Sequence, residues 1–254
     1  MPVTFDTVDF ASRYSKRLAI VVPYRDRAEH LARFVPHMVT YFQRDKLDKQ
    51  IAVSIHIVEQ NGNDPFNRGR LANCGYLLAR ESNDYVVIHD VDYLPIWADY
   101  SWSALPVRLI WYGLSMNEDW NNFFGAIVMF DNAAFEKVSG FPNCYWGWGP
   151  EDLELGQRCK ITGVGYGRRD GTYERLPHKH NGFTSPGVWT ERARETHKVF
   201  DTRRHDMGAF IESDGLRTLK YSVVDKKPLI VGRQPLPNSF HYVVDIGAPE
   251  PATS

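Results

Sequence analysis

Residues 85–92 read Tyr-Val-Val-Ile-His-Asp-Val-Asp. The short apolar run 85–88 is typical of a strand that is covered on both faces of a sheet. Asp90 and Asp92 follow at the carboxyl end of this strand, the edge at which open α/β sheets bind ligands. Carboxylate oxygens favour Mg²⁺ or Mn²⁺ held against a diphosphate. An isolated Asp-x-Asp is more often a solvated acidic turn, so the metal hypothesis needs support from other residues.

Strand-like and helix-like segments alternate on both sides of this motif. Apolar runs predict strands at 18–23, 51–58, 85–88, 124–130, 219–224 and 240–246. Periodicity and capping residues predict helices at 26–41, 70–80, 151–162 and 191–205, and a short one ending at Gly140. Asp131 and Thr190 are the expected N-caps of the short helix and of helix 191–205. This order predicts an α/β fold, with a mostly parallel mixed sheet and flanking helices.

The composition is that of an ordinary globular protein. Length, net charge and apolar patterning exclude several classes of protein. A length of 254 residues predicts a single domain over 1–254, with an N-terminal arm at 1–16 and a frayed tail at 248–254. A net charge of −1 provides no general attraction for nucleic acid or anionic membranes. The longest apolar runs fall short of the roughly 18–20 residues that a membrane span needs. Three widely spaced cysteines favour reduced thiols, and we expect a cytoplasmic protein.

His178 and His180 flank one lysine. In an extended segment, residues two apart point to the same side, so both imidazoles could reach one ion. A histidine pair taken alone is more often a surface or core feature. If a carboxylate ligand is also required, mixed oxygen and imidazole ligation favours Mn²⁺ over Mg²⁺.

Residues 145–152 read Tyr-Trp-Gly-Trp-Gly-Pro-Glu-Asp. Glycines between tryptophans predict a mobile loop, in which an exposed Trp148 covers a sugar ring and becomes buried on the ligand. Pro150 suits the start of a helix, which places Glu151 and Asp152 in its first turn. The alternative is a capped helix with acidic residues at its positive end. Such a carboxylate is expected to have a low pKa, which makes Asp152 a weak base.

Arginines follow two of the expected strands, in Pro23-Tyr24-Arg25-Asp26-Arg27 and in Asp64-Pro65-Phe66-Asn67-Arg68. An arginine beside an aromatic ring suits a stacked nucleotide base and a clamped phosphate. For each segment taken singly, surface arginines next to a turn are at least as common.

Taken in order, these motifs resemble those of the β-1,4-galactosyltransferases of glycosyltransferase family 7. The resemblance runs from about residue 18 to residue 246. It includes segments 23–27, 66–68, 90–92, 140–143, 146–149 with Glu151 and Asp152, 214–216 and 244–247. Phe34-Val35-Pro36-His37-Met38, His89 and the His178/His180 pair are most like the branch that adds galactose to xylose. Where the family has Tyr-x-Gly-Gly, this chain has Phe123-Phe124-Gly125-Ala126, and Pro150 replaces Gly or Arg.

The resemblance implies a single GT-A domain that transfers galactose from UDP-galactose, with inversion, to O4 of an acceptor glycan or glycoside. Asp152 is the implied general base, with Glu151 beside it. Mn²⁺ is the implied cofactor, and its ligands are Asp92, His178 and His180. The implied donor-binding residues are Pro23, Tyr24, Arg25, Arg27, Phe66, Arg68, Asp90, Val91, Trp148 and Gly149. The implied acceptor-binding residues are Phe123, Trp148, Glu151 and Asp152.

Three alternatives stay open at this point. The donor could be UDP-GalNAc or UDP-glucose. The same metal and carboxylate set would serve a metal-dependent sugar-nucleotide hydrolase. A carbohydrate-binding module without catalysis could keep the same fold, although a pure binder would have no need of Asp152.

Overall fold

An eight-stranded sheet forms the centre of the computed structural model, which describes residues 15–44, 51–110, 123–178, 182–185 and 188–249. Among these residues the strand order is β11-β12-β2-β1-β3-β6-β5-β7. The sheet strands are β1 (Arg17–Tyr24), β2 (Ala52–Gln60), β3 (Tyr85–His89), β5 (Val107–Arg108), β6 (Ile127–Asp131), β7 (Gly167–Arg168), β11 (Ser222–Val231) and β12 (Gln234–Asp245). β12, β2, β1 and β3 run parallel, whereas β6 and β11 pair antiparallel with their neighbours. The predicted mixed α/β sheet is therefore confirmed.

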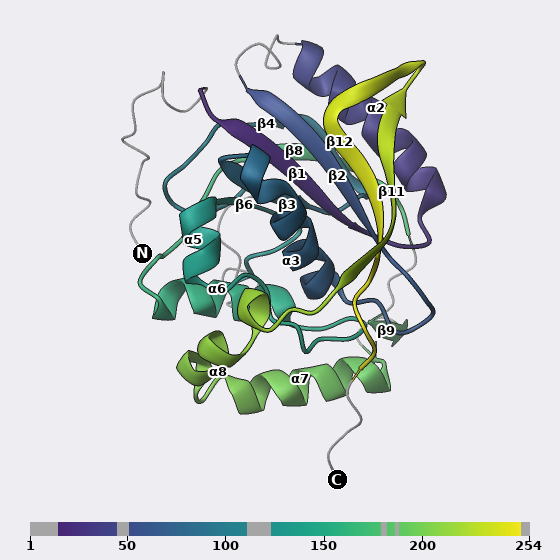
Figure 1. Cartoon of the computed structure of the whole chain (residues 1–254). Helices are drawn as coiled ribbons and strands as arrows, with labels where there is room; N and C mark the ends of the chain where they lie inside the picture. Colours follow the sequence, from purple (N-terminus) through teal and green to yellow (C-terminus); the bar gives the residue numbers. More distant parts are fainter. Residues whose placement is uncertain (1–14, 45–50, 111–122, 179–181, 186–187, 250–254) are drawn as a thin grey trace.

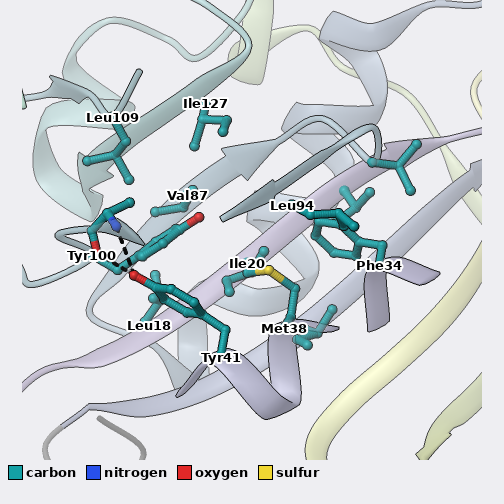
Figure 2. Close-up of a cluster of buried hydrophobic side chains, with 14 of the residues drawn as sticks. Leu18, Ile20, Phe34, Met38, Tyr41, Val87, Leu94, Tyr100, Leu109 and Ile127 are labelled. Carbon is teal, nitrogen blue, oxygen red and sulfur yellow. Dashed lines mark hydrogen bonds between the residues drawn. The ribbon is translucent and has the colours of Figure 1, made fainter. Parts of the chain in front are cut away.

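Helices cover both faces of the sheet (Figure 1). α2 (Ala28–Arg44) packs on one face, where Phe34 and Met38 lie beside Ile20 of β1 (Figure 2). α3 (Arg68–Ala79), α5 (Asn132–Lys137) and α6 (Glu151–Ile161) pack on the other face. The other helices within the described residues are the 3₁₀ turns η2 (Arg80–Ser82) and η3 (Gly215–Arg217), α7 (Glu191–Arg203) and α8 (Met207–Ser213). Among the described residues, no helix has the length and apolar character needed to cross a bilayer.

Two helices start at the capping residues that the sequence predicts. The Asp131 side chain accepts a hydrogen bond from the Ala133 amide at 2.9 Å and caps α5. Thr190 caps α7 in the same way through the Ala193 amide at 3.2 Å. Most of the arm predicted for 1–16 and of the tail predicted for 248–254 lies outside the described residues.

Two element starts differ from the prediction because of a left-handed backbone, and two strands are longer than predicted because they pair with each other. The helix expected from residue 26 starts at Ala28, because Asp26 adopts a positive φ of 53°. The strand expected from residue 124 starts only at Ile127, because Ala126 has a φ of 62° and breaks the extended backbone. The strands expected over 219–224 and 240–246 cover Ser222–Val231 and Gln234–Asp245, because the two pair with each other as a long antiparallel hairpin.

Two small antiparallel sheets have no counterpart in the prediction. β4 (Tyr93–Ala98) pairs with β8 (Gly171–Arg175), and β9 (Phe183–Ser185) pairs with β10 (Val188–Trp189). β4 follows the Asp-Val-Asp segment directly, so its pairing brings the chain near residue 175 to the carboxyl end of β3.

α3 lies unusually close to the sheet at Gly75. A Cβ on Gly75 would overlap the Val21 side chain of β1 and press on Val58 of β2. Since α3 carries Arg68 at its start, this close packing fixes the position of Arg68 at the carboxyl edge of the sheet.

We predict that Gly75→Ala lowers the free energy of unfolding by about 1–3 kcal/mol, because the extra methyl overpacks the core. Gly208→Ala is the matched control: its Cβ meets nothing within 4 Å, and alanine is the better helix former by up to about 1 kcal/mol. Urea unfolding of both variants measures the difference. Equal stability of Gly75→Ala and the unaltered protein would show that α3 does not pack as described.

Candidate active site

Arg68 connects two carboxylates that are distant in the sequence. Its Nε donates to Asp90 Oδ1 at 2.8 Å, and its Nη1 donates to Asp152 Oδ1 at 2.9 Å. Its Nη2 also donates to the Ala126 carbonyl at 3.3 Å. The arginine side chain is only 11% exposed, so both ion pairs are largely shielded from water. Arg68 therefore holds the ends of β3 and α6 together at this edge of the sheet.

The start of α3 is tied to the end of β2, which determines where Arg68 lies. Asn67 caps the helix by accepting a hydrogen bond from the Arg70 amide at 2.9 Å. The backbone amide of Asn67 in turn donates to the Gln60 side-chain oxygen at 2.8 Å. Sequence reasoning assigned Arg68 to the donor phosphates. The structure places its guanidinium between carboxylates, and a contact with phosphate stays a prediction.

Burial changes the acid–base character of the α6 N-terminus. Loss of solvation raises the pKa of Asp152 to about 6, although the charge of Arg68 opposes the rise. Burial and the neighbouring Asp152 raise the pKa of Glu151 to about 8. The low pKa expected for Asp152 is therefore wrong, because desolvation outweighs the favourable helix terminus. A carboxylate with a pKa near 6 is a competent general base at neutral pH.

Gly125 provides the space for the Asp152 carboxyl group. A Cβ at this position would overlap that carboxyl group. The next residue, Ala126, has a left-handed backbone, which few residues other than glycine adopt. Its carbonyl accepts hydrogen bonds from Arg68 and, at 3.1 Å, from the Asp90 amide. The chain therefore holds a strained backbone at the point where the two carboxylates meet.

Asp92 and His178 meet although 85 residues separate them in the chain. In the β4–β8 pair Tyr93 lies opposite Arg175, and the Leu176 amide donates to the Asp92 carbonyl at 2.7 Å. This register brings His178 Nδ1 to 3.2 Å from Asp92 Oδ2. Burial and the nearby Asp90 raise the pKa of Asp92. His180, the third predicted ligand, lies outside the described residues.

His89 supports the Asp-Val-Asp turn from inside the core. Its ring nitrogens lie 2.9 Å from the Asp90 carbonyl and 2.9 Å from the Tyr100 hydroxyl. Burial lowers the pKa of His89 to about 4, so the ring is neutral. Val91 is also buried in this cluster, which leaves Asp90 and Asp92 as the polar side chains of the motif.

An open cavity of about 280 Å³ lies beside the carboxyl ends of β1, β2 and β12. Arg25 lines it, together with residues 59–63 and Val243. The Arg25 guanidinium lies 5.6 Å from the centre of the Phe66 ring, so the structure joins the two arginine-containing segments. Pro23 and Tyr24 are buried below this edge, and Arg27 is half-buried at the turn into α2.

Trp148 is already packed against other rings. Its ring centre lies 5.4 Å from that of Phe183, 5.8 Å from that of Trp189 and 5.5 Å from that of His197. The expectation of an exposed Trp148 is therefore wrong, since the residue is half-buried in this cluster. The Gly147 amide donates to the Phe66 carbonyl at 2.7 Å, which joins the tryptophan loop to the cavity region. Gly149 is half-buried next to Thr196, and movement of the loop stays a prediction.

Sequence reasoning missed a buried ionic network behind the site. Glu154 of α6 accepts hydrogen bonds from Arg158 at 2.9 Å, from Arg203 at 2.7 Å and from the Tyr145 hydroxyl at 2.7 Å. Asp214 accepts from Arg203 at 2.7 Å. The network anchors α6 to α7 and to the segment before η3, and so fixes the helix that carries Asp152. The only signal in the sequence was the family motif at 214–216, to which no role was assigned.

Arg108 was also missed. This arginine is fully buried on β5, and its guanidinium lies 4.7 Å from the centre of the Phe123 ring. Its Nη1 donates to the Phe123 carbonyl at 3.1 Å, and its charge opposes the rise in the pKa of Asp152. Arg108 thus fixes the predicted acceptor-side aromatic residue. No feature of the sequence around Arg108 distinguishes it from a surface arginine.

Two family profiles match consecutive parts of the chain. Residues 10–102 match the N-terminal region of glycosyl transferase group 7. Residues 108–181 match the N-terminal domain of galactosyltransferase. These two ranges contain the Arg68 bridge with both of its carboxylates, as well as Asp92 and His178.

Curated relatives extend this match over most of the chain. The chain is 31% identical to beta-1,4-galactosyltransferase 7 of Drosophila melanogaster, over 87% of this chain and 67% of that protein. It is 32% identical to beta-1,4-galactosyltransferase 7 of Homo sapiens, over 86% of this chain and 65% of that protein. The chain therefore spans about two thirds of the length of these relatives.

A solved structure confirms the GT-A fold. The structure is a variant of Drosophila beta1,4galactosyltransferase 7 in complex with manganese, UDP-Gal and xylobiose. The two structures superpose with a TM-score of 0.70 at 27% sequence identity. The superposition covers 91% of this chain and 94% of the Drosophila chain.

The backbone at Ala126 provides a test of the site geometry. We predict that Ala126→Gly raises the free energy of unfolding by up to about 1 kcal/mol, because a left-handed backbone costs alanine roughly 1–2 kcal/mol. Ala209→Gly, an exposed substitution in α8, should instead lower it by roughly 0.5–1 kcal/mol. Thermal unfolding measures both changes. An equal loss in the two variants would mean that Ala126 is not strained.

Proposed function

Because this chain belongs to glycosyl transferase group 7, the β-1,4-galactosyltransferases, we propose that it transfers galactose from UDP-galactose to O4 of an acceptor sugar, with a xyloside preferred. The observation that carries the proposal is the bridge from Arg68 to Asp90 and Asp152. This bridge places the carboxylate of Asp152, the proposed base, beside the Asp-Val-Asp turn. The relative whose structure holds manganese, UDP-Gal and xylobiose supports the donor and the acceptor.

Asp152 acts as the general base of an inverting displacement. The acceptor hydroxyl attacks the anomeric carbon on the side opposite to UDP. The new carbon–oxygen bond forms as the bond to the phosphate oxygen breaks, and that electron pair leaves with UDP. The acceptor proton moves to Asp152, which is mostly ionised at neutral pH because its pKa is about 6. Glu151, whose pKa is about 8, keeps its proton and can donate a hydrogen bond to the acceptor.

Two of the three predicted ligands of a divalent cation lie together, although no group of three His, Cys, Asp or Glu side chains within the described residues is itself arranged to hold a metal ion. A buried carboxylate oxygen of Asp92 lies 3.2 Å from an imidazole nitrogen of His178, and this oxygen and nitrogen donor set suits Mn²⁺. Asp92 and His178 hold the ion in this proposal, with His180 as the further predicted ligand. When bound, Mn²⁺ neutralises negative charge on the phosphate oxygens of the leaving UDP.

Other residues of the chain bind the donor and the acceptor. Arg25 lines the cavity beside β1 and β2, and its guanidinium lies 5.6 Å from the centre of the Phe66 ring. In this proposal a uracil ring stacks on Phe66 and a phosphate pairs with Arg25. Trp148 and Phe123 are the predicted acceptor-side aromatic residues. Their rings can cover a pyranose and exclude water, which favours transfer over hydrolysis of the donor.

A screen of donors against acceptors tests the proposal. With Mn²⁺ present, UDP-galactose and a β-xyloside should give a β-1,4-linked disaccharide, identified by NMR. UDP-GalNAc, UDP-glucose and GlcNAc acceptors should give lower kcat/KM. Faster transfer to GlcNAc or glucose glycosides would contradict the acceptor assignment. Release of galactose at the same rate with and without an acceptor would instead indicate a hydrolase.

We predict that Asp152→Asn lowers kcat by about 10²–10⁴-fold, the usual loss for a missing general base. Binding of UDP, measured by calorimetry, should be retained, because the amide has the same shape as the carboxyl group. Asp201→Asn, an exposed change on α7, is the control and should keep full activity. Turnover of Asp152→Asn within a few-fold of the unaltered enzyme would remove Asp152 from its role.

A further inference from the structure

Glu59 stands at the carboxyl end of β2 and lines the open cavity beside β1, β2 and β12. In the register of the sheet it lies between Tyr24 of β1 and Val243 of β12. Arg25, which follows Tyr24, lines the same cavity, and its guanidinium lies 5.6 Å from the centre of the Phe66 ring. Arg25 therefore connects the cavity with the ring on which the proposed function places the uracil.

A histidine holds one oxygen of the Glu59 carboxylate. His241 Nε2 lies 2.7 Å from Glu59 Oε2. Because a carboxylate oxygen only accepts hydrogen bonds, the proton of this bond is on the histidine. The His241 ring in turn lies edge-on against the Tyr24 ring, with 5.8 Å between the ring centres and 88° between the planes. The carboxylate is therefore held in one orientation from β12.

The other oxygen of Glu59 can accept a hydrogen bond from a ligand. Among the residues that the structure describes, Glu59 Oε1 has no hydrogen-bond partner. Asn61 and Asn63 line the cavity as well, and their side-chain amides can donate hydrogen bonds. The charged residues of the lining are two carboxylates, Asp26 and Glu59, and one arginine, Arg25. This balance disfavours a phosphate inside the cavity and favours a neutral ring that offers an N–H group.

We propose that Glu59 selects the base of the donor nucleotide by accepting a hydrogen bond from N3–H of uracil. Uracil carries this single donor between two carbonyl oxygens, which suits a carboxylate acceptor with amide donors in the same cavity. A hydrogen bond to a charged acceptor is also stronger than one between neutral groups. The inference rests on the proposed function, because it requires a uridine nucleotide as donor. His241 is a positioning residue that acts through Glu59.

A nucleotide with a methyl group on N3 separates base selection from a structural role. N3-methyl-UDP keeps the ring and the phosphates of UDP but cannot donate from N3. Glu59→Ala removes the acceptor. Glu59→Gln keeps the shape of the side chain, and when its oxygen accepts from His241 it turns an NH₂ group toward the base. Glu195→Gln, an exposed change on α7, is the matched control.

The readout is the dissociation constant of each nucleotide, measured by calorimetry with Mn²⁺ present, and thermal unfolding checks the folding of each variant. The unaltered protein and Glu195→Gln should bind UDP about 10–100-fold more tightly than N3-methyl-UDP, as expected for one hydrogen bond to a charged group. In Glu59→Ala and Glu59→Gln, UDP binding should weaken and most of this preference should disappear.

Two results would overturn this inference alone. One is a preference for UDP that is unchanged in Glu59→Ala, and the other is equal binding of the two nucleotides by the unaltered protein. Failure of the unaltered protein to bind UDP would overturn both the inference and the UDP-galactose donor of the proposed function.

Discussion

The ion pairs of Arg68 with Asp90 and Asp152 are the interaction on which the rest of the site depends. Each carboxylate arrives from a different element, and both are largely shielded from water. Removing one partner of a buried ion pair typically costs about 3–5 kcal/mol, because a charge is left without compensation. The charge of the arginine also opposes the rise in pKa that desolvation causes at Asp152, and so keeps that carboxyl group mostly ionised at neutral pH. One residue therefore determines both the position and the charge of the base.

This arrangement is possible only because small residues stand at two points. Gly75 lets α3 approach β1 and β2 closely enough to bring Arg68 to the sheet edge. Gly125 leaves room for the carboxyl group of Asp152. On the far side of α6, the buried pairs of Glu154 with Arg203 and of Arg158 with Asp214 prevent the helix from moving away. The catalytic geometry is thus a property of the core as much as of the surface.

Much of the fold follows from local signals that a single sequence contains. The apolar runs that become β1 and β3, and the capping residues Asp131 and Thr190, act over a few neighbouring residues. The position of the Asp-Val-Asp turn at the sheet edge could also be predicted, because the turn directly follows the apolar run that becomes β3. The β4–β8 pairing could not be predicted, because it joins segments about 80 residues apart and has no turn signal between them.

The charge states of the site also depend on tertiary structure. A first-turn carboxylate such as Asp152 is expected to be acidic, and only its burial beside Gly125 reverses this expectation. Arg108 resembles a surface residue in the sequence, since nothing nearby shows that β5 is fully covered. The order of the motifs along the chain identified the family, because it combines many weak local signals. Arg108, in contrast, acts through tertiary contacts that no motif contains.

The most direct test of the account is the pH dependence of kcat/KM in the unaltered enzyme and in Arg68→Gln, with Arg68→Lys as the variant that keeps the charge. A general base must be deprotonated, so activity should rise with pH through the pKa of Asp152, about 6 in the unaltered enzyme. Without the Arg68 cation the strongest influence that opposes burial is lost, so the midpoint should move to higher pH in Arg68→Gln and stay near 6 in Arg68→Lys. An unchanged midpoint in Arg68→Gln would contradict the claim that Arg68 controls the base.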